Sequence, residues 1–94
     1  MWKALDIAQK GSEGGIVLND EEYKGICRIT LEKCERYYAI TCGIYGAMCH
    51  TAFCGDEDHM EKYDAMKKEL QGFVDRDTDT EQELDFYSHF CSKY

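Results

Sequence analysis

The feature that most constrains this sequence is a stretch, residues 26–54, in which apolar side chains recur at every second position. Three runs carry the alternation: residues 26–32, 37–44 and 47–54. Such alternation is typical of strands with one buried face. Polar residues at 32–36 and the pair Tyr45-Gly46 separate the runs and favour turns. We therefore predict a three-stranded antiparallel meander, with the β-prone residues 16–18 as a candidate fourth strand.

After Gly55 the period changes from that of a strand to that of a helix. Apolar residues then recur at helical spacing, at Met60, Tyr63, Met66, Leu70, Phe73 and Val74. This pattern predicts a long helix over about residues 57–74, with Asp56 as its N-cap. A capping box at residues 80–83 precedes a second helical stripe, which predicts a short C-terminal helix.

Residues 2–9 show a short helical pattern, ended by a glycine-rich loop, and the acidic residues 19–22 favour a turn. With 94 residues, the chain has room for one domain. The expected fold is therefore a single α+β domain over residues 1–94. In it, a three- to four-stranded antiparallel meander is packed by the long helix, with short N-terminal and C-terminal helices beside it.

The pairing of the strands decides which side chains share a face. We assume two-residue turns at residues 34–35 and 45–46; one face is then almost wholly apolar and should lie under the long helix. The opposite face carries a polar row of Arg28, Thr41 and His50. A fixed cation, a hydroxyl and a titratable imidazole make this row the candidate ligand-binding site. An ordinary polar row is the alternative, and a longer second turn would change the pairing.

The same face also predicts an interaction surface. Its other residues are mostly small or apolar, and the candidate interface residues are Ile26, Tyr37, Ala39, Met48 and Ala52. One long helix covers only one face of a sheet, and this second face is too apolar to be left in water. We therefore expect a homodimer or a stable complex with another protein. The alternative is that the N-terminal and C-terminal helices cover this face.

The charge is concentrated in one segment. The net charge is −8, and residues 56–85 hold twelve acids and four bases, which accounts for all of it. Repulsion from phosphate groups argues against a nucleic-acid partner and favours a basic protein. An inhibitor or immunity-type binder of a basic protein is one such function. No apolar run approaches the ~20 residues of a membrane helix, so we expect no membrane partner.

The chain has six cysteines, which we expect to be reduced. Asp6 lies where a signal peptide would be apolar, so the sequence predicts a cytoplasmic protein with free thiols. The assumed pairing aligns Cys27, Cys42 and Cys49 in a row. Because no Cys-x-x-Cys spacing occurs, we interpret this row as small apolar packing and not as a redox or zinc site.

The sequence predicts no metal site and no cofactor. Cys49 and Cys54 are five apart on a predicted strand and so point to opposite faces, which argues against zinc. In residues 75–79 an acid occupies every second position, as in a calcium-binding loop. Such a loop needs glycine where this chain has Thr80 and glutamate where it has Phe86. We expect a solvated acidic linker there.

Two function classes follow from these patterns. The first is a small protein-interaction module, homodimeric or bound to a basic partner. The second is a small-ligand-binding domain, or a small enzyme, that uses Arg28, Thr41 and His50. No nucleophile motif or phosphate-binding loop is present, so we expect binding rather than catalysis.

Overall fold

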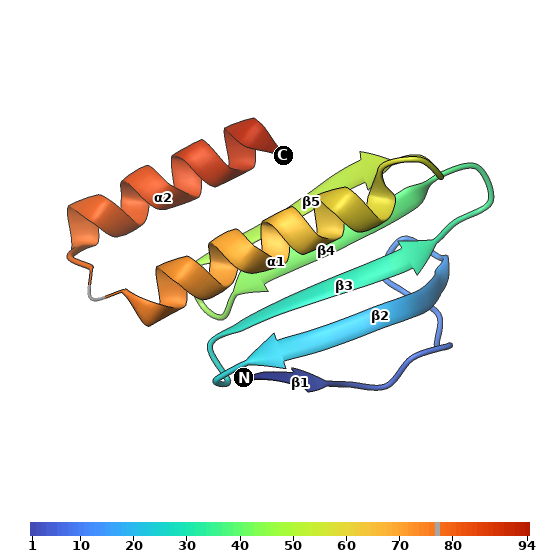
Figure 1. The fold of residues 1–94 in the computed structure, drawn as a ribbon, viewed down its shortest axis with the longest axis horizontal. Coiled ribbons are helices and arrows are strands. Elements are labelled where there is room, and N and C mark those ends of the chain that lie inside the picture. Colours follow the sequence, from blue (N-terminus) through green and yellow to red (C-terminus); the bar gives the residue numbers. More distant parts are fainter. Residues whose placement is uncertain (77) are drawn as a thin grey trace.

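The computed structural model describes residues 1–76 and 78–94, and it shows a sheet with two helices packed on it (Figure 1). The described residues form the strands β1 (Trp2–Ala4), β2 (Ile16–Tyr23), β3 (Cys27–Lys33), β4 (Tyr38–Ile44) and β5 (Met48–Cys54). They also form the helices α1 (His59–Asp75) and α2 (Thr80–Lys93). All paired strands are antiparallel, and their order in the sheet follows the chain. The predicted antiparallel α+β class is confirmed, but the sheet has five strands and not three or four.

The N-terminal helix predicted at residues 2–9 is wrong. Trp2–Ala4 forms β1, an edge strand in which Trp2 pairs with Tyr23 of β2. The two aromatic rings lie 5.1 Å apart between centroids, and the Trp2 indole N–H donates to Gln71 Oε1 at 2.8 Å. A helix of one or two turns is only marginally stable in isolation, so these tertiary contacts decide the conformation.

Strand β2 is longer than the predicted three residues, and it runs through the expected turn at residues 19–22. Its acidic side chains have partners on both faces of the sheet. Asp20 is paired with Arg28, whereas Glu21 accepts from the Tyr63 hydroxyl at 2.7 Å and from the Lys67 ammonium at 2.8 Å. These partners offset the low strand propensity of the acidic run.

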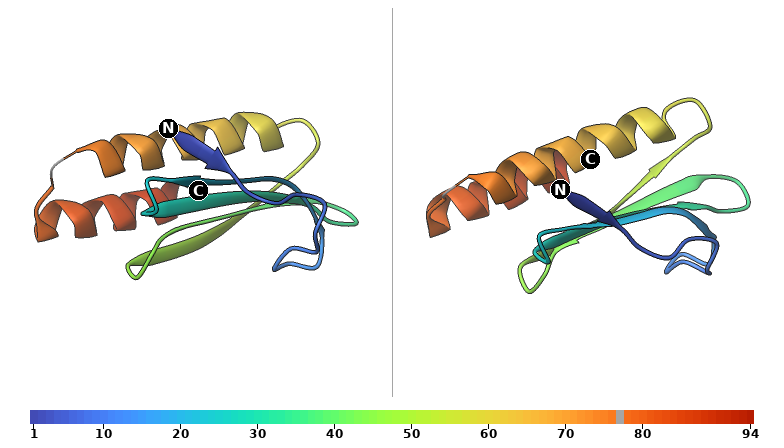
Figure 2. Two further views of the ribbon diagram at one scale, coloured as in Figure 1. Left: turned by 90° about the horizontal axis from the view of Figure 1, so that it is seen from below. Right: turned by 60° about the horizontal axis from the view of Figure 1, so that its bottom comes forward.

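Both helices lie on one face of the twisted sheet (Figure 2). Helix α1 contacts β3 and β4 and buries Tyr63, Met66, Leu70 and Phe73. Helix α2 is held beside it by Phe90, which is 2% exposed, and by Phe86, whose ring stacks on Phe73 at 4.2 Å. The predicted long helix and the C-terminal helix are thus confirmed.

The starts of both helices differ slightly from the prediction. Asp58, and not Asp56, occupies the N-cap of α1. In α2 the N-cap is Asp79, whose side chain accepts from the Gln82 N–H at 2.9 Å, while the Gln82 side chain accepts from the Asp79 N–H at 3.1 Å. A capping box is therefore present, one residue earlier than at the predicted residues 80–83.

Both hairpin turns are longer than the two residues assumed. Residues 34–37 form the first turn, which shifts the pairing by two and keeps every side chain on its predicted face. Residues 45–47 form the second, with Gly46 at φ +77°, a left-handed conformation that favours glycine. This turn shifts the pairing by one residue, so every side chain of β5 lies on the face opposite to the predicted one.

Candidate functional site on the open face of the sheet

The face of the sheet opposite the helices, called the open face below, carries mostly small or polar side chains near its middle. Its inner residues are Asp20, Arg28, Thr30, Thr41, Gly43, Cys49 and Thr51. They are brought together by four strands that are adjacent in the sheet. Because most of these side chains are small, they leave space above the sheet, and this space is the candidate functional site.

The N-terminal segment closes one side of this space. Its backbone follows the edge of β2, with Leu5 N–H donating to Asp20 C=O and Ala8 N–H to Val17 C=O, each at 2.7 Å. The loop of residues 11–15 then folds over the open face, where the buried carboxylate of Glu32 accepts from the backbone N–H groups of Gly15 at 2.9 Å and of Glu13 at 3.2 Å. Glu32 on β3 thus fixes the loop to the sheet.

Gly11 of this loop lies against the Glu32 carboxylate. A Cβ atom there would lie 2.5 Å from Glu32 Oε2, closer than van der Waals contact allows. The absence of a side chain therefore lets the loop backbone approach the carboxylate that holds it.

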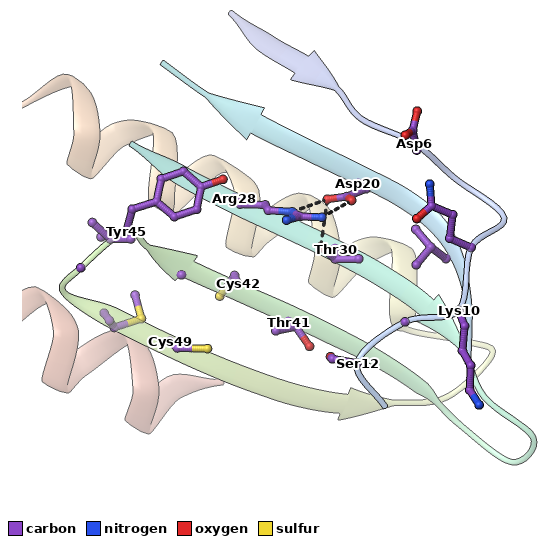
Figure 3. A pocket seen from close by; sticks show the side chains of 17 residues that line it. Asp6, Lys10, Ser12, Asp20, Arg28, Thr30, Thr41, Cys42, Tyr45 and Cys49 are labelled. Carbon is purple, nitrogen blue, oxygen red and sulfur yellow. Dashed lines mark hydrogen bonds and ion pairs between the residues drawn. The ribbon is translucent and has the colours of Figure 1, made fainter. Parts of the chain in front are cut away.

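Together the sheet and the N-terminal segment line a cavity of about 460 Å³ that is open to solvent on one side. Figure 3 shows Tyr45 at one end of the cavity and Lys10 and Ser12 of the loop at the other, with Arg28 and Thr41 between them. The volume falls within the range of pockets that hold small molecules. We call it the open-face cavity.

An ion pair forms one wall of the open-face cavity. Asp20 is 5% exposed, and it accepts from Arg28 Nε at 2.9 Å, from Arg28 Nη2 at 2.5 Å and from the Thr30 hydroxyl at 3.0 Å. The hydrogen bond with Asp20 raises the pKa of Arg28. The two-point pairing fixes the plane of the guanidinium group, while 48% of the Arg28 side chain stays exposed.

The structure brings together two of the three predicted ligand-binding residues. Arg28 and Thr41 both line the open-face cavity, on the neighbouring strands β3 and β4. His50 lies on the other face, where it pairs with Cys42 and packs near Phe90 with ring centroids 6.2 Å apart. The predicted row is therefore wrong for His50, because the three-residue turn reverses the faces of β5.

His50 has one unusual property on the helix face. Its Nε2 atom is buried and has no hydrogen-bond partner among the described residues. The partly exposed histidine thus lies between the sheet and α2, away from the open-face cavity.

The predicted interface residues do not form one surface. Ala39 is on the open face and fully buried, whereas Ala52 and Met48 lie on the helix face. Ile26 is exposed in the turn between β2 and β3, and Tyr37 is exposed just before β4. Again the one-residue shift of β5 separates residues that the sequence places together.

Sequence analysis missed Phe53, which forms an exposed pair with the predicted residue Tyr37 on the open face. Phe53 of β5 is 58% exposed, and its ring packs edge-on against the Tyr37 ring with centroids 5.4 Å apart. Cys49 lies on the same strand and is exposed beside the cavity. The signal that would have found them is the spacing between Ile44 and Met48, which allows a three-residue turn around Gly46.

The six cysteines are all free thiols. Cys27 and Cys42 lie on the helix face and Cys49 on the open face, so the predicted three-thiol row does not form. Burial raises the pKa of Cys27 to about 11 and that of Cys42 to about 12. These two thiols thus remain protonated at neutral pH and pack as apolar groups.

No group of three His, Cys, Asp or Glu side chains within residues 1–76 and 78–94 is placed to hold a metal ion. The acidic stretch of residues 75–79 includes Asp77, which lies outside the described residues. Asp75 at its start accepts from the Tyr23 hydroxyl at 2.8 Å and from the Lys24 ammonium at 2.9 Å. The hydrogen bond from Lys24 lowers the pKa of the Asp75 carboxyl.

Comparisons with protein-family models, with curated proteins and with solved structures give no match to this chain. Of the two helices in the described part of the chain, neither is long and apolar enough to cross a membrane.

A substitution tests whether Glu32 holds the loop. Replacing Glu32 with alanine leaves the backbone N–H groups of Gly15 and Glu13 without their acceptor, and we expect a loss of about 2 kcal/mol in the free energy of unfolding. Hydrogen exchange at both N–H groups should accelerate. Glu35→Ala, in the exposed first turn, is the control and should change stability by less than about 0.5 kcal/mol. Equal effects of the two substitutions would contradict this role.

Proposed function

We propose that this protein is a protein-interaction module that binds an extended basic segment of another protein along the outer edge of β5. The observation that carries the proposal is the character of this edge. Strand β5 is seven residues long, and it contains no aspartate, glutamate, lysine, arginine or proline. Edge strands of soluble proteins are commonly protected by such residues because an unprotected edge pairs with other chains.

The hydrogen-bonding phase shows which groups of β5 are available. Cys34 N–H donates to Tyr37 C=O and Tyr45 N–H to Ile26 C=O, which fixes the alternation between β3 and β4. In this alternation the backbone N–H and C=O groups of Thr41 bond to β3, and those of its neighbours Ile40 and Cys42 bond to β5. Thr51 lies opposite Thr41 on β5, so its backbone groups do not bond to β4. Thr51 therefore directs its backbone N–H and C=O groups outward, and so do Cys49 and Phe53.

The opposite edge of the sheet lacks these properties. Strand β1 has only three residues, and the middle one is Lys3. The chain beyond it continues along β2 through the bonds of Leu5 and Ala8. Of the two edges in the described part of the sheet, β5 is thus the one suited to accept another strand.

The charge next to β5 favours a basic partner. Asp56, Glu57 and Asp58 follow the strand directly and are all exposed. They belong to the segment of residues 56–85 that holds the whole net charge of −8. A second copy of the chain carries the same net charge of −8 and would be repelled, whereas a basic segment would be attracted.

Phe53 and Tyr37 supply apolar contact area beside the edge. Their rings touch each other and remain exposed on the open face. A strand added to β5 would place its own side chains on this face next to Phe53. The proposed partner thus has alternating basic and apolar residues, as an exposed strand of a basic enzyme would have. Free thiols and the acidic charge are in keeping with an inhibitor of this kind in the cytoplasm.

The proposal is tested with a short synthetic peptide of alternating lysine and valine. We expect it to bind the protein and to shift the backbone amide NMR signals of Thr51 and Phe53. Thr51→Pro removes an outward N–H without breaking a bond to β4, and it should weaken binding at least about tenfold. Thr51→Val keeps the N–H and is the matched control; it should bind as the natural chain does.

Three outcomes would overturn the proposal. The first is equal binding of a glutamate–valine peptide, which would remove the charge argument. The second is undiminished binding by Thr51→Pro. The third is a homodimer in sedimentation equilibrium, with a mass near twice that of the chain, that becomes a monomer in the Thr51→Pro variant. In that case β5 would pair with a second copy, as in the homodimer that the sequence predicts.

A further inference from the structure

From the geometry of the open-face cavity, we infer that it binds a small monocarboxylic acid with an apolar body, whose carboxylate pairs with Arg28. This inference is independent of the strand partner, because the cavity lies over the open face of β2 to β5, whereas the proposed strand partner binds the outward backbone groups at the edge of β5. Three observations carry it: the unused donors of Arg28, the balance of charge around the cavity, and its apolar end.

Arg28 has donors to spare and a fixed orientation. Of the five N–H donors of a guanidinium group, two are used by Asp20, through Nε and Nη2. Nη1 has no hydrogen-bond partner among the described residues. The Asp20 pair holds the plane of the group, so its remaining edge is presented to the cavity at low entropic cost. Such an edge binds a planar carboxylate through two parallel hydrogen bonds.

The charges around the cavity limit its ligand to at most one negative charge. Arg28 and Lys10 line it as cations and Asp20 and Asp6 as anions, so the lining is neutral in sum. Asp20 already accepts three hydrogen bonds and offers little to a ligand. A phosphate dianion would need more positive charge than this, in a chain whose net charge is −8. A monocarboxylate brings one charge, for which Arg28 supplies the donors.

The rest of the cavity suits an apolar body. Beyond Arg28, Gly43 and the Tyr45 ring line the cavity, and the lining residues Ile44 and Met48 contribute backbone there because their side chains lie on the helix face. The Tyr45 hydroxyl itself donates to Glu22 at 2.6 Å, so its ring forms a fixed end wall. Thr41 provides a hydroxyl next to this end, and it is only weakly engaged, at 3.3 Å from the Thr51 hydroxyl.

The volume limits the size of the ligand. About 460 Å³ accommodates an acid with a short aliphatic chain or one aromatic ring, with water filling the remainder. The probes for the test are therefore benzoate and hexanoate. Their amides, benzamide and hexanamide, have nearly the same shape but no charge, so they isolate the carboxylate.

Titrations monitored by backbone amide NMR at neutral pH and low salt test the inference. We expect both acids to shift the signals of Arg28, Thr41 and Gly43, and the amides to bind at least about tenfold more weakly. Arg28→Lys keeps a positive charge beside Asp20 but loses the planar fork, so it should weaken acid binding at least about tenfold. Arg36→Lys, in the exposed first turn, is the matched control and should leave binding unchanged.

A second variant keeps the test decisive if Arg28→Lys fails to fold. Cys49 is exposed at the cavity and has no role in the core, so Cys49→Phe should fill the space without unfolding the protein and should abolish acid binding. Binding of the amides as tight as that of the acids would overturn the inference. So would signal shifts confined to surface lysines, or no binding of either acid up to about 10 mM. Thr51→Pro should bind the acids normally, which separates failure of this inference from failure of the strand proposal.

Discussion

Replacing Phe90 with alanine should lower the free energy of unfolding by about 3–4 kcal/mol. Phe90 is the one residue of α2 that is buried, at 2% exposure. Its ring lies among those of Phe86, Tyr94 and His50, with centroids 5.5, 4.9 and 6.2 Å away. Removing it leaves a cavity between the sheet and the helix, and urea unfolding measured by circular dichroism gives the loss directly.

The same helix offers a matched control. Leu84 is 61% exposed, and Leu84→Ala should change stability by less than about 0.5 kcal/mol. If both substitutions cost the same, α2 is not anchored through Phe90. A further readout is hydrogen exchange, since loss of the anchor should accelerate exchange throughout α2 and leave β3 and β4 protected.

The second large effect is a loss of stability in alkaline solution. Burial raises the pKa of Cys27 to about 11 and that of Cys42 to about 12, whereas an unfolded thiol titrates near about 8.5–9. Above that pH the unfolded chain releases two protons that the folded chain keeps, so unfolding becomes easier as the pH rises. Between about pH 9 and about pH 11 the two thiols together should remove about 4 kcal/mol.

Other groups titrate in the same range, so the thiols must be isolated by a variant. The double substitution Cys27→Ala, Cys42→Ala should be less stable at neutral pH but should lose markedly less between pH 9 and pH 11. Urea unfolding with a reducing agent present measures both curves. Parallel curves for the two proteins would show that the buried thiols do not account for the loss.

The sequence predicts those parts of the fold in which periodicity is strong. The faces of β3 and β4 and the buried stripe of α1 follow from side-chain spacing alone. Strand β1 could not be predicted, because three residues carry no period and its conformation depends on Trp2 packing against Tyr23. Strand β2 could not be predicted in full, because acidic residues are uncommon in strands. Their partners, Arg28 on β3 and Lys67 on α1, become apparent only in the folded structure.

The candidate site was predictable only in part, for two reasons: one extra residue in the second turn, and the unpredicted pairing of β2 with β3. Arg28 and Thr41 lie on β3 and β4, where the predicted pairing is wrong by two residues. A shift of two leaves each side chain on its predicted face, so both line the cavity. His50 lies beyond the second turn, where one extra residue exchanges the faces. Asp20, which orients Arg28, carries no sequence signal beyond its charge, because its pairing depends on the register of β2 against β3.

The order of the strands bears on how quickly the protein reaches its native state. Each strand of the sheet pairs with its neighbour in the chain, and the turns from β2 to β5 span only a few residues. Closing such short loops costs little chain entropy, so the sheet can assemble one hairpin after another. Pairing between strands that follow each other in the chain keeps the contact order of the sheet low, which correlates with rapid folding.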